Sequence, residues 1–131
     1  MNISRETLAW IVTKARAFDV KDVDTHEPGA FDDDEEAMGV LEDRPGDPTE
    51  IELRSWIADL TETEAAELVA LFWLGRDGGD ASEFPALVEQ ARASQSTPTA
   101  DYLLGSPLLA DHLEAGLETM GEDVAALESL I

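Results

Sequence analysis

The sequence predicts an all-α fold: a compact single domain of about five to seven short helices around a central apolar helix. Apolar residues recur at helical spacing along most of the 131 residues, and no segment shows the apolar–polar alternation of a strand. Several stretches open with a helix-start signal, either a capping box or a polar residue followed by Pro. The run from Leu68 to Leu74 is apolar on every side, which is typical of a helix surrounded by others.

The sequence of the N-terminal part predicts one helix followed by a linker. Ser4 can cap a helix that runs to about Phe18, because the apolar residues of this stretch form one helical stripe. Trp10 lies off the stripe, so either a neighbouring helix covers it or it stays partly exposed as a contact point. A polar linker is expected near residues 19–33, and the acids at 32–36 favour a short helix after it, because they complement the helix dipole.

The middle of the chain carries two strong start signals. Asp-Pro-Thr-Glu opens a helix over residues 47–60, since Asp can cap and Pro suits the first helical position. Thr-Glu-Thr-Glu at 61–64 is a capping box and opens the central apolar helix, which is expected to end at Gly75. Trp56 and Trp73 are expected in the core.

Shorter helices are expected in the C-terminal part. Ser82 can cap one that fades in Ser94-Gln95-Ser96. Helices near 98–104 and 107–120 each begin with a polar residue followed by Pro. A short helical tail is expected near 122–131, so that residues 1–131 form one acidic helical domain.

Charge is the most unusual property of the chain. Thirty Asp and Glu stand against eight Lys and Arg, which gives a formal net charge of −22. A surface of this kind repels nucleic acid and anionic membranes, because binding to either depends on Lys and Arg. The natural electrostatic partner is a protein with a basic surface, although the charge can also serve solubility alone. The oligomeric state does not follow from these properties.

The sequence favours the cytoplasm. It has no cysteine, which excludes disulfides and thiolate metal sites and permits a reducing compartment. The N-terminus lacks a secretory pattern, and no apolar run approaches the roughly 20 residues of a membrane span.

The residues that could carry catalysis are few. His26 lies in the expected linker, and His112 lies at the border between the apolar and acidic sides of its helix. His112 is either a hydrogen-bonded boundary residue or a histidine whose charge nearby carboxylates stabilise. The acids at 32–36 could attract Ca²⁺ or Mg²⁺ weakly but lack the spacing of a calcium loop. We therefore predict no catalytic, cofactor-binding or metal-binding residues and no cofactor.

A more informative feature is the apolar segment from Tyr102 to Leu109, which Gly105 and Pro107 break. Such a segment is either a tightly packed corner or an exposed docking surface. A sharp turn is not expected to bury all of its large side chains on one side. The candidate interaction surface comprises Tyr102, Leu103, Leu104, Pro107 and Leu108, with Trp10 as a further contact point.

These features favour a non-catalytic, acidic interaction module that binds a basic or apolar protein surface. One alternative is an enzyme that uses scattered carboxylates, with or without a divalent metal. A second is a nucleic-acid mimic, in which carboxylates stand in for phosphates against a basic DNA-binding protein.

Three segments carry a resemblance to known proteins: Ala15-Arg16-Ala17-Phe18-Asp19-Val20-Lys21, Leu71-Phe72-Trp73-Leu74-Gly75-Arg76, and Thr99-Ala100-Asp101-Tyr102-Leu103-Leu104-Gly105-Ser106-Pro107-Leu108-Leu109. In order and spacing they resemble a family of short, uncharacterised proteobacterial proteins, a domain of unknown function. The resemblance spans nearly the whole chain, and the third segment is its most specific part. It implies a single-domain, bacterial, cytoplasmic protein and assigns no catalytic or binding residues.

Overall fold

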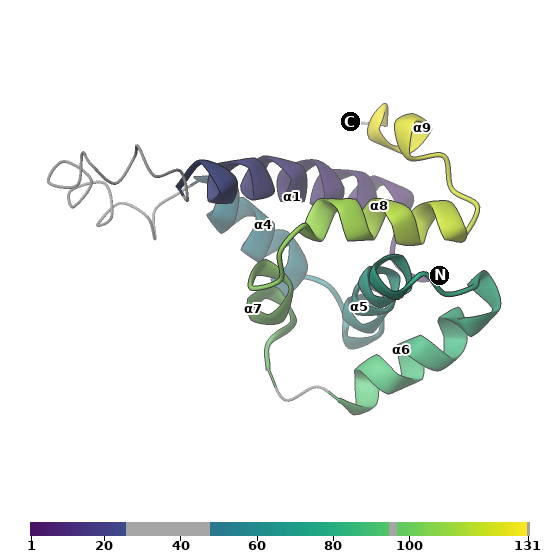
Figure 1. Ribbon diagram of the computed structural model, residues 1–131. Coiled ribbons are helices and arrows are strands. Elements are labelled where there is room, and N and C mark those ends of the chain that lie inside the picture. The colour runs from purple at the N-terminus through teal and green to yellow at the C-terminus, as the bar shows by residue number, and fades with distance from the viewer. Residues whose placement is uncertain (26–47, 95–96, 131) are drawn as a thin grey trace, which may run out of the picture.

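Helices form all the regular secondary structure in the residues that the computed structural model describes, 1–25, 48–94 and 97–130 (Figure 1). The predicted all-α class is therefore confirmed for this part of the chain. The helices are α1 (Arg5–Thr25), α4 (Pro48–Ala58), α5 (Glu62–Asp77), the 3-10 helix η2 (Ala81–Glu83), α6 (Phe84–Ala93), α7 (Thr99–Leu104), α8 (Leu109–Thr119) and α9 (Val124–Glu128).

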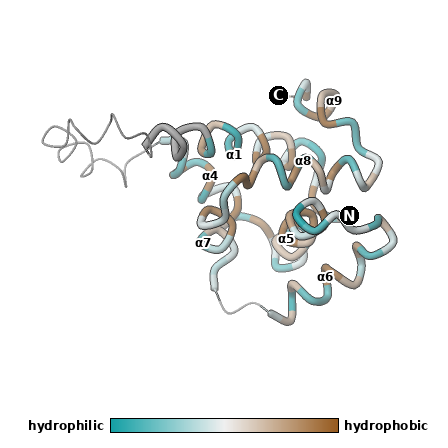
Figure 2. The backbone as a smooth tube through the Cα atoms, viewed as in Figure 1, coloured by the Kyte–Doolittle hydropathy of each residue, from teal (hydrophilic) through white to brown (hydrophobic). Residues whose placement is uncertain are grey.

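The predicted central helix is α5, which packs against α6, α7 and α8 (Figure 1). Six of the seven residues from Leu68 to Leu74 are buried, and only Trp73 keeps part of its surface exposed. The first helix, α1, packs against α8 and also contacts α4 and α9. Hydrophilic and hydrophobic residues alternate along α6 and α8, as expected for helices with one buried face (Figure 2). The buried residues of these helices form one hydrophobic core.

The start of α5 follows the sequence signal, but its end does not. Thr61 and Glu64 form the reciprocal capping box, so two backbone N–H groups at the helix start are satisfied. The helix continues through Gly75 to Asp77 and ends at Gly78, which has the left-handed φ of 73°. The predicted end at Gly75 is therefore wrong.

Gly75 instead serves the crossing of α5 with α8. A Cβ atom built on it would overlap the carbonyl oxygen of His112 and would lie 2.7 Å from the backbone N of Gly116. A Cβ on Gly116 would overlap the carbonyl oxygen of Leu71. The two glycines therefore let the backbones of α5 and α8 touch.

The first helix is longer than predicted, and the expected linker at 19–33 is wrong in its first part. Residues 19–25 belong to α1. Asp19 has a structural partner that local sequence patterns do not reveal. Its Oδ2 accepts a hydrogen bond of 2.8 Å from the backbone N of Ala110, 91 positions away, in the first turn of α8. The rest of the expected linker, His26 and the acids at 32–36 lie outside the described residues.

Two other helix starts also differ from their predictions. Ser82 lies inside η2 and donates a hydrogen bond to Asp80, while α6 begins at Phe84. The helix expected near 107 begins at Leu109, because Leu108 adopts a left-handed conformation that an α-helix does not allow. Within the predicted tail, α9 spans Val124–Glu128 and is capped by Asp123.

The N-terminus is fixed by a carboxylate on the central helix. Glu67, on α5, is 6% exposed. Its two oxygens accept hydrogen bonds of 2.8 and 2.9 Å from the backbone N of Asn2, and Oε1 also accepts one of 2.9 Å from the backbone N of Ile3. A buried carboxylate needs such partners, so the N-terminal residues and α5 stabilise one another.

Most of the basic side chains with described surroundings are engaged in ion pairs. Arg16 joins α1 to Glu114 of α8 and Glu128 of α9. The other pairs are Arg5–Glu122, Lys14–Glu52, Arg54 with Glu50 and Asp101, and Arg76–Asp77. Each exposed pair adds little stability. Their consequence for binding is that the surface left without partners is predominantly acidic.

Candidate functional site

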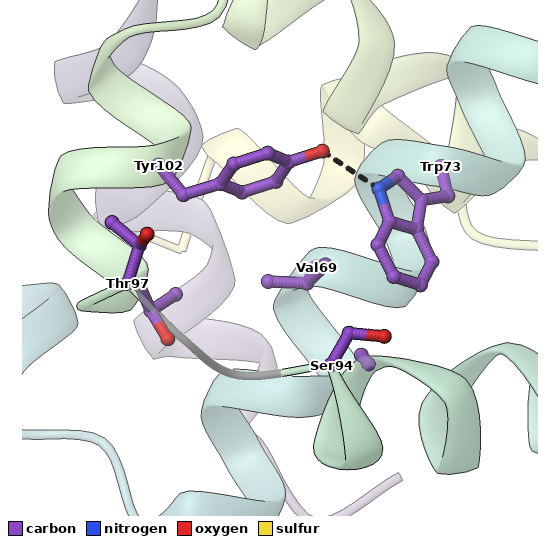
Figure 3. Close-up of a pocket in the computed structure, with 7 residues that line it drawn as sticks. Val69, Trp73, Ser94, Thr97 and Tyr102 are labelled. Atoms are coloured by element: carbon purple, nitrogen blue, oxygen red, sulfur yellow. Dashed lines mark hydrogen bonds between the residues drawn. The ribbon is translucent and has the colours of Figure 1, made fainter.

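A cleft lies beside α5, where α6 and α7 flank it (Figure 3). Its volume is about 200 Å³. α5 contributes Val69 and Trp73 one turn apart, which places both side chains on one helix face. The remaining lining residues come from the end of α6 and the region of α7: Ala91, Ser94, Thr97, Thr99 and Tyr102.

Two aromatic side chains form one wall of the cleft. The Nε1–H of Trp73 donates a hydrogen bond of 2.8 Å to the hydroxyl oxygen of Tyr102 (Figure 3). The Tyr102 ring also meets Phe72 edge to face, with centroids 6.1 Å apart. Packing and hydrogen bonding therefore fix the Tyr102 ring, and a ligand would meet a preformed aromatic surface.

None of the described side chains that line this cleft is charged. Val69, Ala91 and the two aromatic rings supply apolar surface, and Ser94, Thr97 and Thr99 supply hydroxyls. Pockets for whole small molecules are usually about 300–1,000 Å³. A cavity of about 150 Å³ is large enough for benzene. A cleft of about 200 Å³ therefore suits one apolar or aromatic side chain.

One charged pair lies on α5, a turn beyond Trp73. The Arg76 guanidinium donates hydrogen bonds of 3.0 and 3.3 Å to the Asp77 carboxylate, and they hold the pKa of Asp77 below its usual value. Arg76 also lies over the Phe72 ring, 5.5 Å from its centroid. The two charges of this pair compensate each other.

The structure divides the predicted interaction segment into a buried and an exposed part. Leu103 and Leu104 are 0% and 8% exposed and belong to the core, so they cannot form a docking surface in this fold. Tyr102 is half-buried in the cleft, and Pro107 and Leu108 are exposed. The segment is thus a packed corner on one side and an accessible turn on the other, because Gly105 and Pro107 break the helix as the sequence indicates.

Leu108 is unusual in two respects. Its φ of 57° and ψ of 39° are left-handed, and it is the only non-glycine residue with positive φ in the described part of the chain. Leu108 is 52% exposed, so its partial burial offsets only part of the energy that this backbone conformation costs. Folding alone therefore does not explain a leucine here.

Replacing Leu108 by Gly should therefore stabilise the folded chain. Glycine adopts left-handed angles without steric cost, whereas leucine pays about 1 kcal/mol. We expect the free energy of unfolding to rise by up to about 0.5 kcal/mol in urea melts, because glycine's larger loss of chain entropy offsets much of the gain. Leu108→Ala is the matched control, because it removes the side chain but keeps the strained φ. A Gly variant less stable than the Ala variant would contradict this account.

A second cavity of about 220 Å³ lies where α4 leads into α5. It is lined by Thr7, Ser55, Trp56, Asp59, Leu60 and Glu64. Trp56 was expected in the core, but it is half-buried and stacks on Trp10, with centroids 5.8 Å apart and an interplanar angle of 17°. Both alternatives for Trp10 are partly met, because a neighbouring helix covers one side of the ring and the residue stays partly exposed.

His112 is a half-buried boundary residue. Its ring meets Phe72 edge to face, with centroids 5.4 Å apart. Among the residues that the structure describes, no group of three or more His, Cys, Asp or Glu side chains is arranged to hold a metal ion. None of the described helices is long and apolar enough to cross a membrane.

The cleft is built from tertiary contacts that local sequence patterns do not reveal. Tyr102 was a predicted site residue, but Val69, Ser94, Thr97 and Thr99 were not. The one available signal was the hydroxyl-rich connection between the helices near 82–93 and 98–104, which could have indicated a polar cavity edge.

The fold and cleft define a small, acidic, all-α domain with side-chain-sized cavities. Residues 50–122 match the model of a family described as "Protein of unknown function (DUF3775)", and the chain belongs to that family. The matched region runs from α4 to the end of α8 and contains every residue that lines the first cleft. Neither a curated protein nor a solved structure matches the chain.

Proposed function

We propose that this chain is a non-catalytic interaction module that binds another protein through the α5–α6–α7 cleft and the adjacent turn at Pro107 and Leu108. The observation that carries the proposal is the pairing of a cleft sized for one side chain with an exposed, strained leucine in the turn that follows α7. The cleft would receive an apolar anchor of the partner, and Leu108 would insert into the partner in turn. We place this interaction in the cytoplasm.

The net charge of −22 supports a partner with a basic surface. Opposite charge speeds association and selects against acidic partners, while the uncharged cleft and Leu108 supply the contact energy. The same charge disfavours a second copy of this chain as the partner, because the two copies would repel each other.

The test is capture of partner from native cells by the tagged chain, quantified by mass spectrometry. The test variant combines Tyr102→Ala with Leu108→Ala. The control combines Ile51→Ala with Leu130→Ala, which removes two other apolar side chains of 49% and 51% exposure. We expect the test variant to lose at least about tenfold in capture, since hot-spot residues cost about 2 kcal/mol or more each, and the control to capture normally.

Tyr102 also supports Phe72 and Trp73, so circular dichroism and a thermal melt accompany the capture. If the double variant unfolds, Leu108→Gly replaces it, because that change should not weaken the fold. Normal capture by a folded variant of either kind would overturn the proposal.

A further inference from the structure

We propose that the cavity between α4 and α5 binds a Lys or Arg side chain of the partner, an inference that rests on the proposed function and names the basic group it requires. The cavity brings together residues from three helices: Thr7 of α1, Trp56 and neighbouring residues at the end of α4, and Glu64 of α5. The Thr61 capping box holds the connection between α4 and α5 in place.

The lining has the chemistry that a long cationic side chain requires. Trp56 and Leu60 offer apolar surface to the methylene stem. Asp59 and Glu64 offer carboxylates to the ammonium or guanidinium head, and the indole of Trp56 can add a cation–π contact. Thr7 and Ser55 add hydroxyls that can accept hydrogen bonds. A neutral or acidic side chain would leave the two carboxylates without a counter-charge.

The carboxylates are available to a ligand. Asp59 is exposed and lies at the end of α4. Glu64 uses Oε1 to accept the hydrogen bond from the backbone N of Thr61, and the capping box does not need its second oxygen. The Trp10 ring stacked on Trp56 limits rotation of the indole, so the aromatic wall is formed before binding.

Trp10, which stacks on Trp56, already contacts one cation of this chain. The Lys14 ammonium lies 5.4 Å from the centroid of a Trp10 ring and pairs with Glu52 at 2.6 Å. An indole and a carboxylate thus come together twice near α4. Trp10 and Glu52 contact Lys14 of the chain itself, and Trp56 lies with Asp59 and Glu64 around the open cavity.

The test uses a synthetic peptide, acetyl-Gly-Lys-Gly-Arg-Gly-Lys-Gly-amide, titrated into the full chain at physiological ionic strength, where diffuse attraction is screened beyond about 8 Å. Binding is followed by the indole Nε1–H resonance of Trp56, assigned with Trp56→Phe. The test variant is Asp59→Asn with Glu64→Gln, because Gln preserves the capping box. The control is Glu89→Gln with Asp111→Asn, which removes the same charge from exposed positions on α6 and α8.

We expect the peptide to shift the Trp56 resonance, the test variant to raise Kd about tenfold, and the control to raise it about twofold or less. Equal losses in the two variants would show that only diffuse acidity attracts the peptide and would overturn the proposal, as would an unmoved Trp56 resonance. Partner capture through the cleft and Leu108 is measured separately. If capture depends on the cleft but the peptide does not bind, only the proposed cation site is refuted. If capture does not depend on the cleft, the proposed function is refuted even when the peptide binds.

Discussion

Replacing Gly116 by Ala should destabilise the fold by about 3 kcal/mol, the upper end of what overpacking costs. The new Cβ would overlap the carbonyl oxygen of Leu71 on α5. Backbone atoms cannot rotate aside as a side chain can, so α5 and α8 would have to separate. The separation would loosen the contact between α8 and the central helix. We expect Tm to fall by about 10 °C in a thermal melt.

Whether Gly116→Ala raises or lowers stability distinguishes a close helix crossing from an ordinary helix position. In the interior of a helix, Gly→Ala ordinarily stabilises by about 0.5–1 kcal/mol, because alanine has the better helix propensity. Glu118→Ala is a matched control on the exposed side of α8 and should leave Tm nearly unchanged. A Gly116→Ala variant as stable as the wild type would mean that α5 and α8 do not cross closely.

Replacing Glu67 by Ala should cost about 2–3 kcal/mol, since charge-assisted hydrogen bonds are strong and the buried N–H of Ile3 would lose its acceptor. Ile3 is only 4% exposed and packs in the core, so release of the N-terminal residues would also remove apolar contacts. We expect a lower midpoint in urea and faster hydrogen exchange at the amides of Asn2 and Ile3.

Two further variants calibrate this result. Glu67→Gln keeps one acceptor oxygen and should lie between the wild type and Glu67→Ala in stability. Glu62→Ala, on the exposed start of α5, should change the free energy of unfolding by less than about 0.5 kcal/mol. Unchanged exchange at Ile3 in Glu67→Ala would contradict the assigned hydrogen bonds.

Features set by neighbouring residues could be predicted from the sequence. The Thr61–Glu64 capping box, the apolar run of α5 and the break between α7 and α8 all depend on residues within a turn of one another. The helical class and the central helix follow from such local signals.

Features set by distant partners could not be predicted. A glycine gives the same sequence signal whether it ends a helix or permits a close helix crossing, so the sequence does not reveal the role of Gly75. The sequence predicts a linker at Asp19, whose partner, Ala110, lies 91 positions away. Glu67 likewise meets Asn2 across 65 positions.

The same distinction between local and distant contacts applies to the candidate site. Tyr102, Pro107 and Leu108 were predicted because Gly105 and Pro107 mark a turn with more apolar side chains than one side can bury. The left-handed angles of Leu108 have no local sequence signal. Trp73 was expected in the core, because helical spacing does not distinguish a side chain that faces the core from one that forms a cavity wall.

Site-specific photo-crosslinking tests the central claim most directly. The photoreactive residue p-benzoylphenylalanine would replace Leu108 in one variant and Leu130, which has a similar exposure of 51%, in another. Both chains would be irradiated in native cells, and crosslinked products identified by mass spectrometry. We predict that the probe at 108 crosslinks to a protein with a basic surface and that the probe at 130 does not. Crosslinks to the same proteins from both positions, or none from 108, would contradict a binding surface at the cleft and its adjacent turn.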